Sequence, residues 1–252
     1  MGRKEPFLIL AIVAAVIFSA AFACNTDSGS SSNSSSNSSS NSSSNSTSTS
    51  SSSHNIAGDY DAKGTNPDGR KYEASLKITP HDDVYQFTWV SGKNTSDGVG
   101  VMTDDEVAVA FTGGESGKGC GVVLYRIDSP GNMSGKIGYW GTNTMETETA
   151  VRKTGNGDDL DGVYNVSGKN PDGKDYTGSL TVIQSGSGYT FDWDAGSQIS
   201  GFGVRAGKYV AVGFGGKQCS FVGYDIKANG TLEGKWGGQT TRSFGTEVAT
   251  KN

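Results

Sequence analysis

The chain has 252 residues, of which 33% are hydrophobic and 38 are glycine, and its formal net charge at pH 7 is −5. A net negative charge disfavours nucleic acid or an anionic membrane surface as the main partner, because both would repel it. The two histidines, His54 and His81, are too few for a histidine-rich metal site, and a histidine-based catalytic triad is not expected.

The first 23 residues have the layout of an export signal. Arg3 and Lys4 precede the uncharged apolar run 7–23, which ends in small residues before Cys24. This order is typical of a secretory signal. Cleavage before Cys24 resembles the signal of bacterial lipoproteins, which implies a lipid-modified Cys24 and attachment to the outer membrane or cell surface. Two alternatives stay open: ordinary cleavage with free secretion, and an uncleaved anchor, for which the run is at the short limit of about 17–25 residues.

Residues 24–55 consist almost entirely of serine, asparagine and threonine. No large apolar side chain occurs in this stretch before Ile56, so it cannot offset the entropy lost on ordering, and we predict a disordered linker. Such a coil would hold its ends ~30 Å apart on average. A protein tethered through Cys24 would use this spacer to hold its folded part clear of the membrane.

From residue 56 onward the sequence repeats itself. Residues 56–67 read IAGDYDAKGTNP and residues 160–171 read LDGVYNVSGKNP, and the same offset, 193 − 89 = 104, relates Trp89 to Trp193. A solenoid unit has only ~20–50 residues, so this repeat indicates a duplicated domain. Chemistry that the ancestral domain needed should therefore occur in both copies.

The duplication predicts three segments after the linker. Residues 56–154 form the first module, 155–159 a short linker, and 160–252 the second module. Apolar and polar residues alternate with a period of two through both modules, without sustained helical periodicity. Asn-Pro-Asp-Gly at 66–69 and at 170–173 is typical of a tight turn between strands.

Eight short strands are expected in each module. Those of the second lie near 162–169, 174–184, 188–195, 198–205, 208–214, 218–227, 231–237 and 243–250, and the first repeats them between about 58 and 152. Eight consecutive antiparallel strands can close into a barrel with no free edge. We therefore predict an all-β fold of two tandem eight-stranded antiparallel up-and-down β-barrels, with β-sandwich modules as the alternative.

The interior of so small a barrel is just filled by side chains or holds one small ligand. Large apolar side chains of the first module share one face of its strands: Tyr85, Phe87, Trp89, Val109 and Phe111, with Tyr125 from a later strand. We interpret them as core, and a ligand cage is the alternative.

One composite pattern occurs in both modules, from Gly58 to about Lys251. It reads Gly-x-Tyr-x-(Val/Ala)-x-Gly-x-Asn-Pro-Asp-Gly-x-x-Tyr, followed by Tyr-x-Phe-x-Trp and a closing Glu-Thr-Glu or Gly-Thr-Glu. This pattern resembles bacterial secreted repeat proteins commonly labelled fibronectin-binding. The resemblance implies tandem small barrels, similar in outline to avidin-like and lipocalin-like folds, and a host extracellular-matrix protein such as fibronectin as partner.

Cys120 and Cys219 stand at matching places in the two modules (219 − 120 = 99). We expect each to line the core of its own module, as small buried thiols often do. A disulfide between the modules is the alternative, because an exported protein meets an oxidising environment.

The best shared acidic residues are Glu148 and Glu247 (247 − 148 = 99). A glycosidase needs two carboxyl groups, and one per module is too few. We expect a structural role, such as a hydrogen bond across the barrel end or to Lys136 and Lys235. No catalytic residue, cofactor or metal site is predicted, and the protein is not expected to be an enzyme.

Tyr139 and Trp140 form the candidate binding site. The strand pattern places Trp140 outward or on the barrel rim, whereas the second copy has Gly238 and Gln239 there. An exposed tryptophan beside a tyrosine can anchor a protein or carbohydrate partner, and packing against the neighbouring module is the alternative. The resulting hypothesis is a non-enzymatic, surface-tethered lipoprotein with two binding modules. The alternative is a periplasmic or surface carrier of a small apolar ligand.

Overall fold

The computed structural model describes residues 54–252, apart from 115–116, 118, 129–130, 156–158 and 242. Cys24, the predicted signal and the predicted linker up to residue 53 lie outside this part. The described residues form β-strands and no helix. No helix that could cross a membrane therefore occurs among them.

The strands fall into two sets of eight, one from each repeat. Those of the first repeat are β1 (Gly58–Thr65), β2 (Lys71–His81), β3 (Val84–Ser91), β4 (Asn94–Thr103), β5 (Glu106–Gly113), β6 (Cys120–Ile127), β7 (Met133–Tyr139) and β8 (Glu146–Thr154). Those of the second repeat are β9 (Gly162–Lys169), β10 (Asp175–Ser185), β11 (Gly188–Asp194), β12 (Gln198–Ala206), β13 (Tyr209–Gly215), β14 (Ser220–Ile226), β15 (Leu232–Gly238) and β16 (Gly245–Lys251). The predicted strands of the second copy agree with the observed ones to within about two residues at each end.

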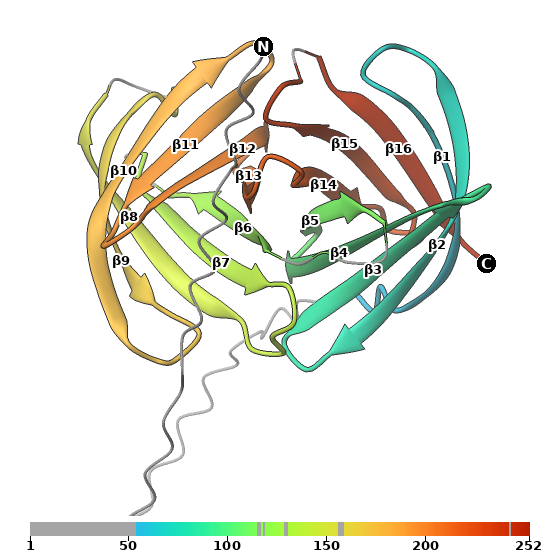
Figure 1. Ribbon diagram of the computed structural model, residues 1–252, viewed down its shortest axis with the longest axis horizontal. Coiled ribbons are helices and arrows are strands. Elements are labelled where there is room, and N and C mark those ends of the chain that lie inside the picture. The colour runs from blue at the N-terminus through green and yellow to red at the C-terminus, as the bar shows by residue number, and fades with distance from the viewer. Residues whose placement is uncertain (1–53, 115–116, 118, 129–130, 156–158, 242) are drawn as a thin grey trace, which may run out of the picture. The chain divides into compact units, whose positions relative to one another are not determined.

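The strands close into two antiparallel barrels (Figure 1). Barrel A has the order β1-β16-β15-β14-β5-β4-β3-β2, and barrel B has the order β10-β11-β12-β13-β6-β7-β8-β9. The predicted all-β class and the two eight-stranded antiparallel barrels are confirmed, and the β-sandwich alternative is wrong.

The two repeats exchange strands. Barrel A combines β1–β5 of the first repeat with β14–β16 of the second, and barrel B combines β6–β8 of the first with β9–β13 of the second. Figure 1 shows this as two colour groups in each barrel: blue-green with red on the right, yellow-green with orange on the left. The prediction that residues 56–154 and 160–252 each close into a barrel of their own is therefore wrong.

Exchange is possible because β5 and β13 are equivalent strands. Residues 107–111 read VAVAF and residues 210–214 read VAVGF, so a following strand meets the same pattern on either one. Accordingly β14 pairs with β5, and β6 pairs with β13. A period-two pattern determines which face of a strand is buried, but it cannot distinguish between two equivalent neighbours.

Each barrel has an apolar interior that is closed at one end by a tyrosine. In barrel A the Tyr60 hydroxyl donates to the carbonyl of Ile56 at 2.8 Å, and in barrel B Tyr164 donates to Leu160 at 2.8 Å. All four residues are buried. Ile56 and Leu160 therefore belong to the buried core of the barrel that their bonded tyrosine closes.

The predicted aromatic core is only partly correct in its membership. Phe87 is fully buried in barrel A and stacks on Trp89, with ring centroids 5.6 Å apart. Tyr125, however, lies in the interior of barrel B, because β6 belongs to that barrel. Its equivalent Tyr224 occupies the matching place in barrel A.

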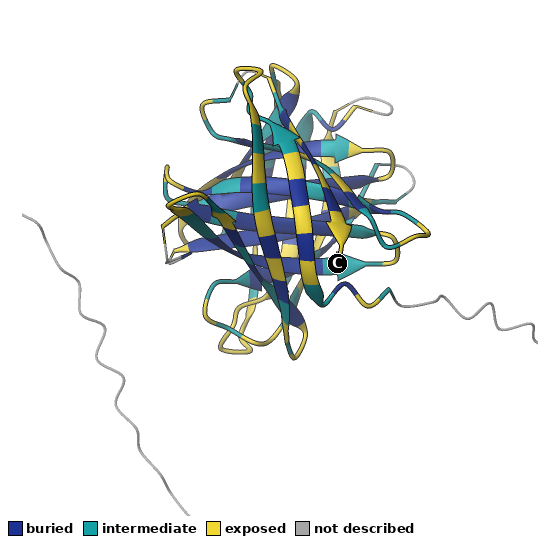
Figure 2. Cartoon of the chain, turned by 90° about the vertical axis from the view of Figure 1, so that its right-hand side faces the viewer, coloured by how far each residue is buried: buried dark blue, intermediate teal, exposed yellow. Residues whose placement is uncertain are grey.

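A third core lies between the barrels. It consists mainly of outward-facing side chains of β4–β6 and β12–β14: Val84, Val99, Val101, Ala108, Ala110, Cys120, Val122, Leu124, Phe202, Val204, Tyr209, Ala211, Cys219 and Phe221. Strands at this contact are buried on both faces. Figure 2 shows the contrasting outer wall beside the C-terminus, where buried and exposed residues alternate along each strand.

A disulfide joins Cys120 to Cys219 in this third core, with the Cα atoms 5.7 Å apart. The expectation that each cysteine lines the core of its own module is wrong. Strand exchange brings the starts of the equivalent strands β6 and β14 together, so the two cysteines meet. A hydrogen bond of 2.9 Å from the Tyr209 hydroxyl to the Asp104 carboxylate also links barrel B to barrel A.

Candidate functional site

One glutamate is buried near the mouth of barrel A, at the end that carries the β1–β2 and β3–β4 turns. Glu247 of β16 is 4% exposed. Its carboxylate accepts hydrogen bonds from the Tyr72 hydroxyl at 2.7 Å, from the Trp89 indole Nε1 at 3.1 Å, and from the Tyr224 hydroxyl. Both carboxylate oxygens therefore act as acceptors, as an ionised carboxylate does.

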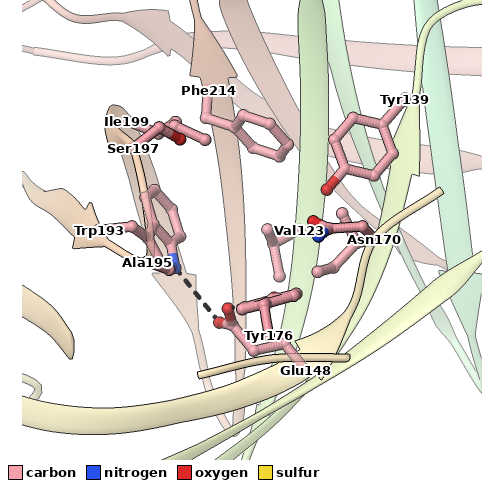
Figure 3. A pocket seen from close by; sticks show the side chains of 11 residues that line it. Val123, Tyr139, Glu148, Asn170, Tyr176, Trp193, Ala195, Ser197, Ile199 and Phe214 are labelled. Carbon is pink, nitrogen blue, oxygen red and sulfur yellow. Dashed lines mark hydrogen bonds between the residues drawn. The ribbon is translucent and has the colours of Figure 1, made fainter. Parts of the chain in front are cut away.

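Barrel B repeats this arrangement around Glu148 of β8. The carboxylate accepts from the Tyr176 hydroxyl at 2.6 Å, from Trp193 Nε1 at 3.2 Å, and from the Tyr125 hydroxyl. Figure 3 shows the bond between Trp193 and Glu148. Burial raises the pKa of Glu148, and its three hydrogen bonds oppose part of that rise.

Each carboxylate cluster joins strands from both repeats. Tyr72 and Trp89 come from the first repeat, whereas Tyr224 and Glu247 come from the second. The predicted hydrogen bonding of the shared glutamates across the barrel end is confirmed. The predicted bond to Lys136 is wrong, because its ammonium group donates to the carbonyl of Met102 at 3.0 Å.

The space beside the two clusters differs sharply. Barrel A holds a cavity of about 300 Å³, and barrel B holds one of about 80 Å³. The larger cavity is lined by Asn66, Tyr72, Ala74, Trp89, Ser91, Asn94, Ser96, Phe111, Val222, Tyr224, Trp236 and Glu247. The smaller one has room for only a few water molecules, since each takes about 30 Å³ in the liquid.

Two replacements distinguish the surroundings of the two cavities. Ser96 faces Trp89 in barrel A, whereas Ile199 faces Trp193 in barrel B. Gly238 of β15 corresponds to Tyr139 of β7 (238 − 139 = 99).

The tyrosine ring of barrel B enters its mouth and packs on Phe214, with ring centroids 5.6 Å apart (Figure 3). Barrel A has no side chain at the corresponding position, so its mouth stays open.

Aromatic rings form the walls of the barrel A cavity. Trp89 and Phe111 have centroids 5.2 Å apart with planes at 46°, and Phe111 and Trp236 have centroids 6.2 Å apart at 63°. Tyr72 meets Trp236 at 6.2 Å and 79°. Neighbouring rings thus stand at angles, as adjoining walls do. Among the described residues of the lining, Glu247 carries the only charged side chain.

Trp236 is the residue that sequence reasoning missed. It is half-buried, and its indole Nε1 has no hydrogen-bond partner among the described residues. The first repeat has Ile137 at the equivalent place (236 − 137 = 99). Residues shared by both repeats do not include this position. A tryptophan without a counterpart in the other repeat, close to Gly238, could have indicated a binding site.

The predicted binding residues Tyr139 and Trp140 point to different places. Tyr139 lies in the mouth of barrel B, whereas Trp140 is half-buried and packs against the core between the barrels. Trp140 lies beside Val84 and Val99, which come from its own repeat but belong to the other barrel. A binding role for either residue stays a prediction, as does lipidation of Cys24, which lies outside the described residues.

Among the described residues, no group of three or more histidine, cysteine, aspartate or glutamate side chains is placed to hold a metal ion. Comparisons with protein-family models, with curated proteins and with solved structures find no match for this chain. The resemblance to repeat proteins labelled fibronectin-binding therefore stays a prediction.

Proposed function

We propose that this chain is an exported, non-enzymatic binding protein that takes a small, largely apolar ligand into the mouth of barrel A. The cavity of about 300 Å³ carries this proposal. Ligand sites typically have 300–1,000 Å³, with apolar and aromatic walls and a few polar groups that orient the ligand. The barrel A cavity matches that description at the small end of the range.

The arrangement of the carboxylates favours binding over catalysis. Each cavity holds a single glutamate, and three hydrogen bonds engage it. A hydrolytic pair of carboxyl groups would need a second one about 5–10 Å away, and neither cavity lining includes one. Barrel B, which keeps the carboxylate cluster but little open space, serves as a structural partner that completes barrel A.

The proposal includes the cellular location of the protein. The apolar run 7–23 followed by Cys24 supports export and lipid attachment at the outer membrane or cell surface, and the serine- and asparagine-rich residues 24–53 support a spacer. Mass spectrometry of the mature N-terminus tests this point. A diacylated or triacylated Cys24 is expected, and an unmodified cysteine would indicate free secretion.

Native mass spectrometry tests the ligand. Protein purified without denaturant should carry a small molecule that is released on unfolding, in a ratio of one per chain. The double variant Ser96→Ile, Gly238→Tyr copies the walls of barrel B into barrel A and should lose that molecule. A Cβ at Gly238 would meet the Ser220 Oγ at 3.3 Å, so that hydroxyl must shift by a few tenths of an ångström to admit a side chain there.

The reciprocal variant, Tyr139→Gly with Ile199→Ser, is the matched control, because it changes barrel B and should leave the ligand of barrel A in place. Both variants should melt cooperatively. Retention of the bound molecule by the filled barrel A would refute the proposed site.

The sequence resemblance implies an extracellular-matrix protein as a binding partner. Solid-phase binding of residues 54–252 to a matrix panel tests it, with an unrelated acidic barrel as the control. A signal for fibronectin that survives filling of barrel A would place that partner on the outer surface, separate from the cavity.

A further inference from the structure

We propose that the ligand of barrel A is a small organic cation, an ammonium group carried on an apolar body. The inference rests on the proposed function and specifies the chemical class of the ligand. It combines three features of the mouth: an aromatic box, one buried carboxylate beside it, and no positively charged side chain among the described residues of the lining.

The aromatic box favours a positive charge. The faces of aromatic rings carry negative potential, so a cation within about 6 Å of a ring centroid is attracted, most strongly by tryptophan. Trp89 and Trp236 stand on either side of Phe111, at centroid distances of 5.2 and 6.2 Å from it. A ligand group in the cavity therefore meets several rings at once.

The carboxylate has capacity left for a ligand. An ionised carboxylate offers about four acceptor sites. Oε1 of Glu247 accepts from Trp89 and Tyr224, whereas Oε2 accepts from Tyr72 alone. All three donors belong to uncharged side chains, so the carboxylate has no countercharge among the described residues of the lining. An ammonium group would supply one through its charge, and where it carries an N–H, that N–H could donate to the remaining acceptor site of Oε2.

Barrel B provides an internal comparison. Its carboxylate cluster has the same four residue types, with bonds of 2.6 Å from Tyr176 and 3.2 Å from Trp193 to Glu148. Ile137 stands where barrel A has Trp236, and the cavity there is only about 80 Å³. The carboxylate cluster therefore stabilises the wall of both barrels, and only barrel A adds the aromatic box that admits a ligand.

A matched pair of probes tests the charge. Benzyltrimethylammonium and neopentylbenzene have the same shape, with a quaternary nitrogen in the first replaced by carbon in the second. We expect one benzyltrimethylammonium to bind per chain of the full-length protein, at least about tenfold more tightly than the neutral probe. Isothermal titration calorimetry and quenching of tryptophan fluorescence measure both affinities.

Variants assign the effect to the site. Glu247→Gln keeps an acceptor for the tyrosines and removes the charge, and it should weaken benzyltrimethylammonium binding at least about tenfold without strengthening neopentylbenzene binding. Glu148→Gln, the same change in barrel B, should leave both affinities unaltered. If Glu247→Gln fails to fold, Trp236→Ile, which copies Ile137, should give a similar loss because it removes one wall of the box.

The outcomes separate this inference from the proposed function. Equal binding of both probes would overturn the cationic ligand and leave a carrier of apolar molecules. Binding of neither probe, with a neutral or anionic molecule found by native mass spectrometry, would also overturn it. Binding of the cation that is unaffected by Glu247→Gln and by Trp236→Ile would show a different site, and the inference would fail.

Discussion

The two barrels share one scaffold and differ at the mouth. Both are closed by a plugging tyrosine at one end and hold a glutamate with two tyrosines and a tryptophan at the other. Barrel A combines Trp236 with the side-chain-free Gly238, whereas Tyr139 fills the mouth of barrel B. Shared residues therefore report what the fold requires, and unshared residues report what one copy has acquired.

The largest expected loss of unfolding free energy follows removal of the disulfide that links the two barrels. The disulfide closes a loop of 99 residues, for which the chain-entropy model gives about 4–5 kcal/mol. The double variant Cys120→Ala, Cys219→Ala should lose about 3–4 kcal/mol of unfolding free energy in urea titrations. Both barrels should still unfold in one transition because each contains strands of both repeats, and two separate transitions would show that the exchange does not couple them.

Truncating the buried glutamate should cost a different amount of unfolding free energy in each barrel. Glu148→Ala leaves two hydroxyls and one indole N–H without an acceptor in a nearly filled space, and we expect a loss of about 3 kcal/mol or more. Glu247→Ala leaves equivalent donors beside a cavity that water can enter, so about 1–2 kcal/mol is expected. Chemical denaturation of both variants measures the difference. Equal losses would mean that water does not reach the cluster of barrel A.

The closed ends of the barrels differ in charge, which predicts a pH effect. Glu106 of barrel A corresponds to Tyr209 of barrel B (209 − 106 = 103). Burial and the neighbouring Asp225 raise the pKa of Glu106 to about 7, with Asp105 adding to the rise and Lys227 and Lys208 opposing it. The protonated form is thus favoured in the folded state.

This raised pKa gives a definite sign to the pH dependence. The contribution of Glu106 is fully present below its unfolded pKa of about 4.5 and is lost as pH rises through about 7. Between about pH 5 and pH 8 the protein should therefore lose about 1–2 kcal/mol, after allowance for solvent screening. Glu106→Gln should reduce the slope, and the raised pKa of Glu148 should maintain a smaller slope of the same sign. An unchanged slope would assign the effect to other groups.

The smallest effect is expected on the outer walls. Ile183 of barrel B is 54% exposed and corresponds to Thr79 of barrel A (183 − 79 = 104). Ile183→Thr should change the unfolding free energy by no more than about 0.5 kcal/mol, because solvent already covers much of the side chain. A loss above about 1 kcal/mol in thermal or urea unfolding would indicate that this position contacts a partner or another copy of the chain.

The sequence predicted the local structure well because local rules determine it. Alternation identified the strands, and the Asn-Pro-Asp-Gly turns place Gly69 at φ +85° and Gly173 at φ +79°, where glycine is favoured. Strand exchange could not be predicted, since β5 and the equivalent strand β13 offer the same alternating pattern to a following strand. The disulfide and the core between the barrels depend on that exchange, so the disulfide was only the alternative prediction and the core was missed.

The site was half predictable. Glu148 and Glu247 occupy equivalent positions in the two repeats, and this correspondence identified the carboxylate clusters. A buried acidic side chain that both copies retain needs hydrogen-bond partners. The cavity depends on residues that are absent from one copy, Trp236 and Ser96 among them, and on the volume that Gly238 leaves open. Volume is a property of packed side chains, which periodicity does not describe.

The exchanged strands also set an order of assembly. β1 pairs with β16, with Tyr60 opposite Lys251, so barrel A is sealed by the two extremes of the folded polypeptide. Barrel B has all its strands once β13 has left the ribosome, whereas barrel A also needs β14–β16. A chain that stops after β13 contains every strand of barrel B but lacks three strands of barrel A, so the larger cavity can form only after the smaller one.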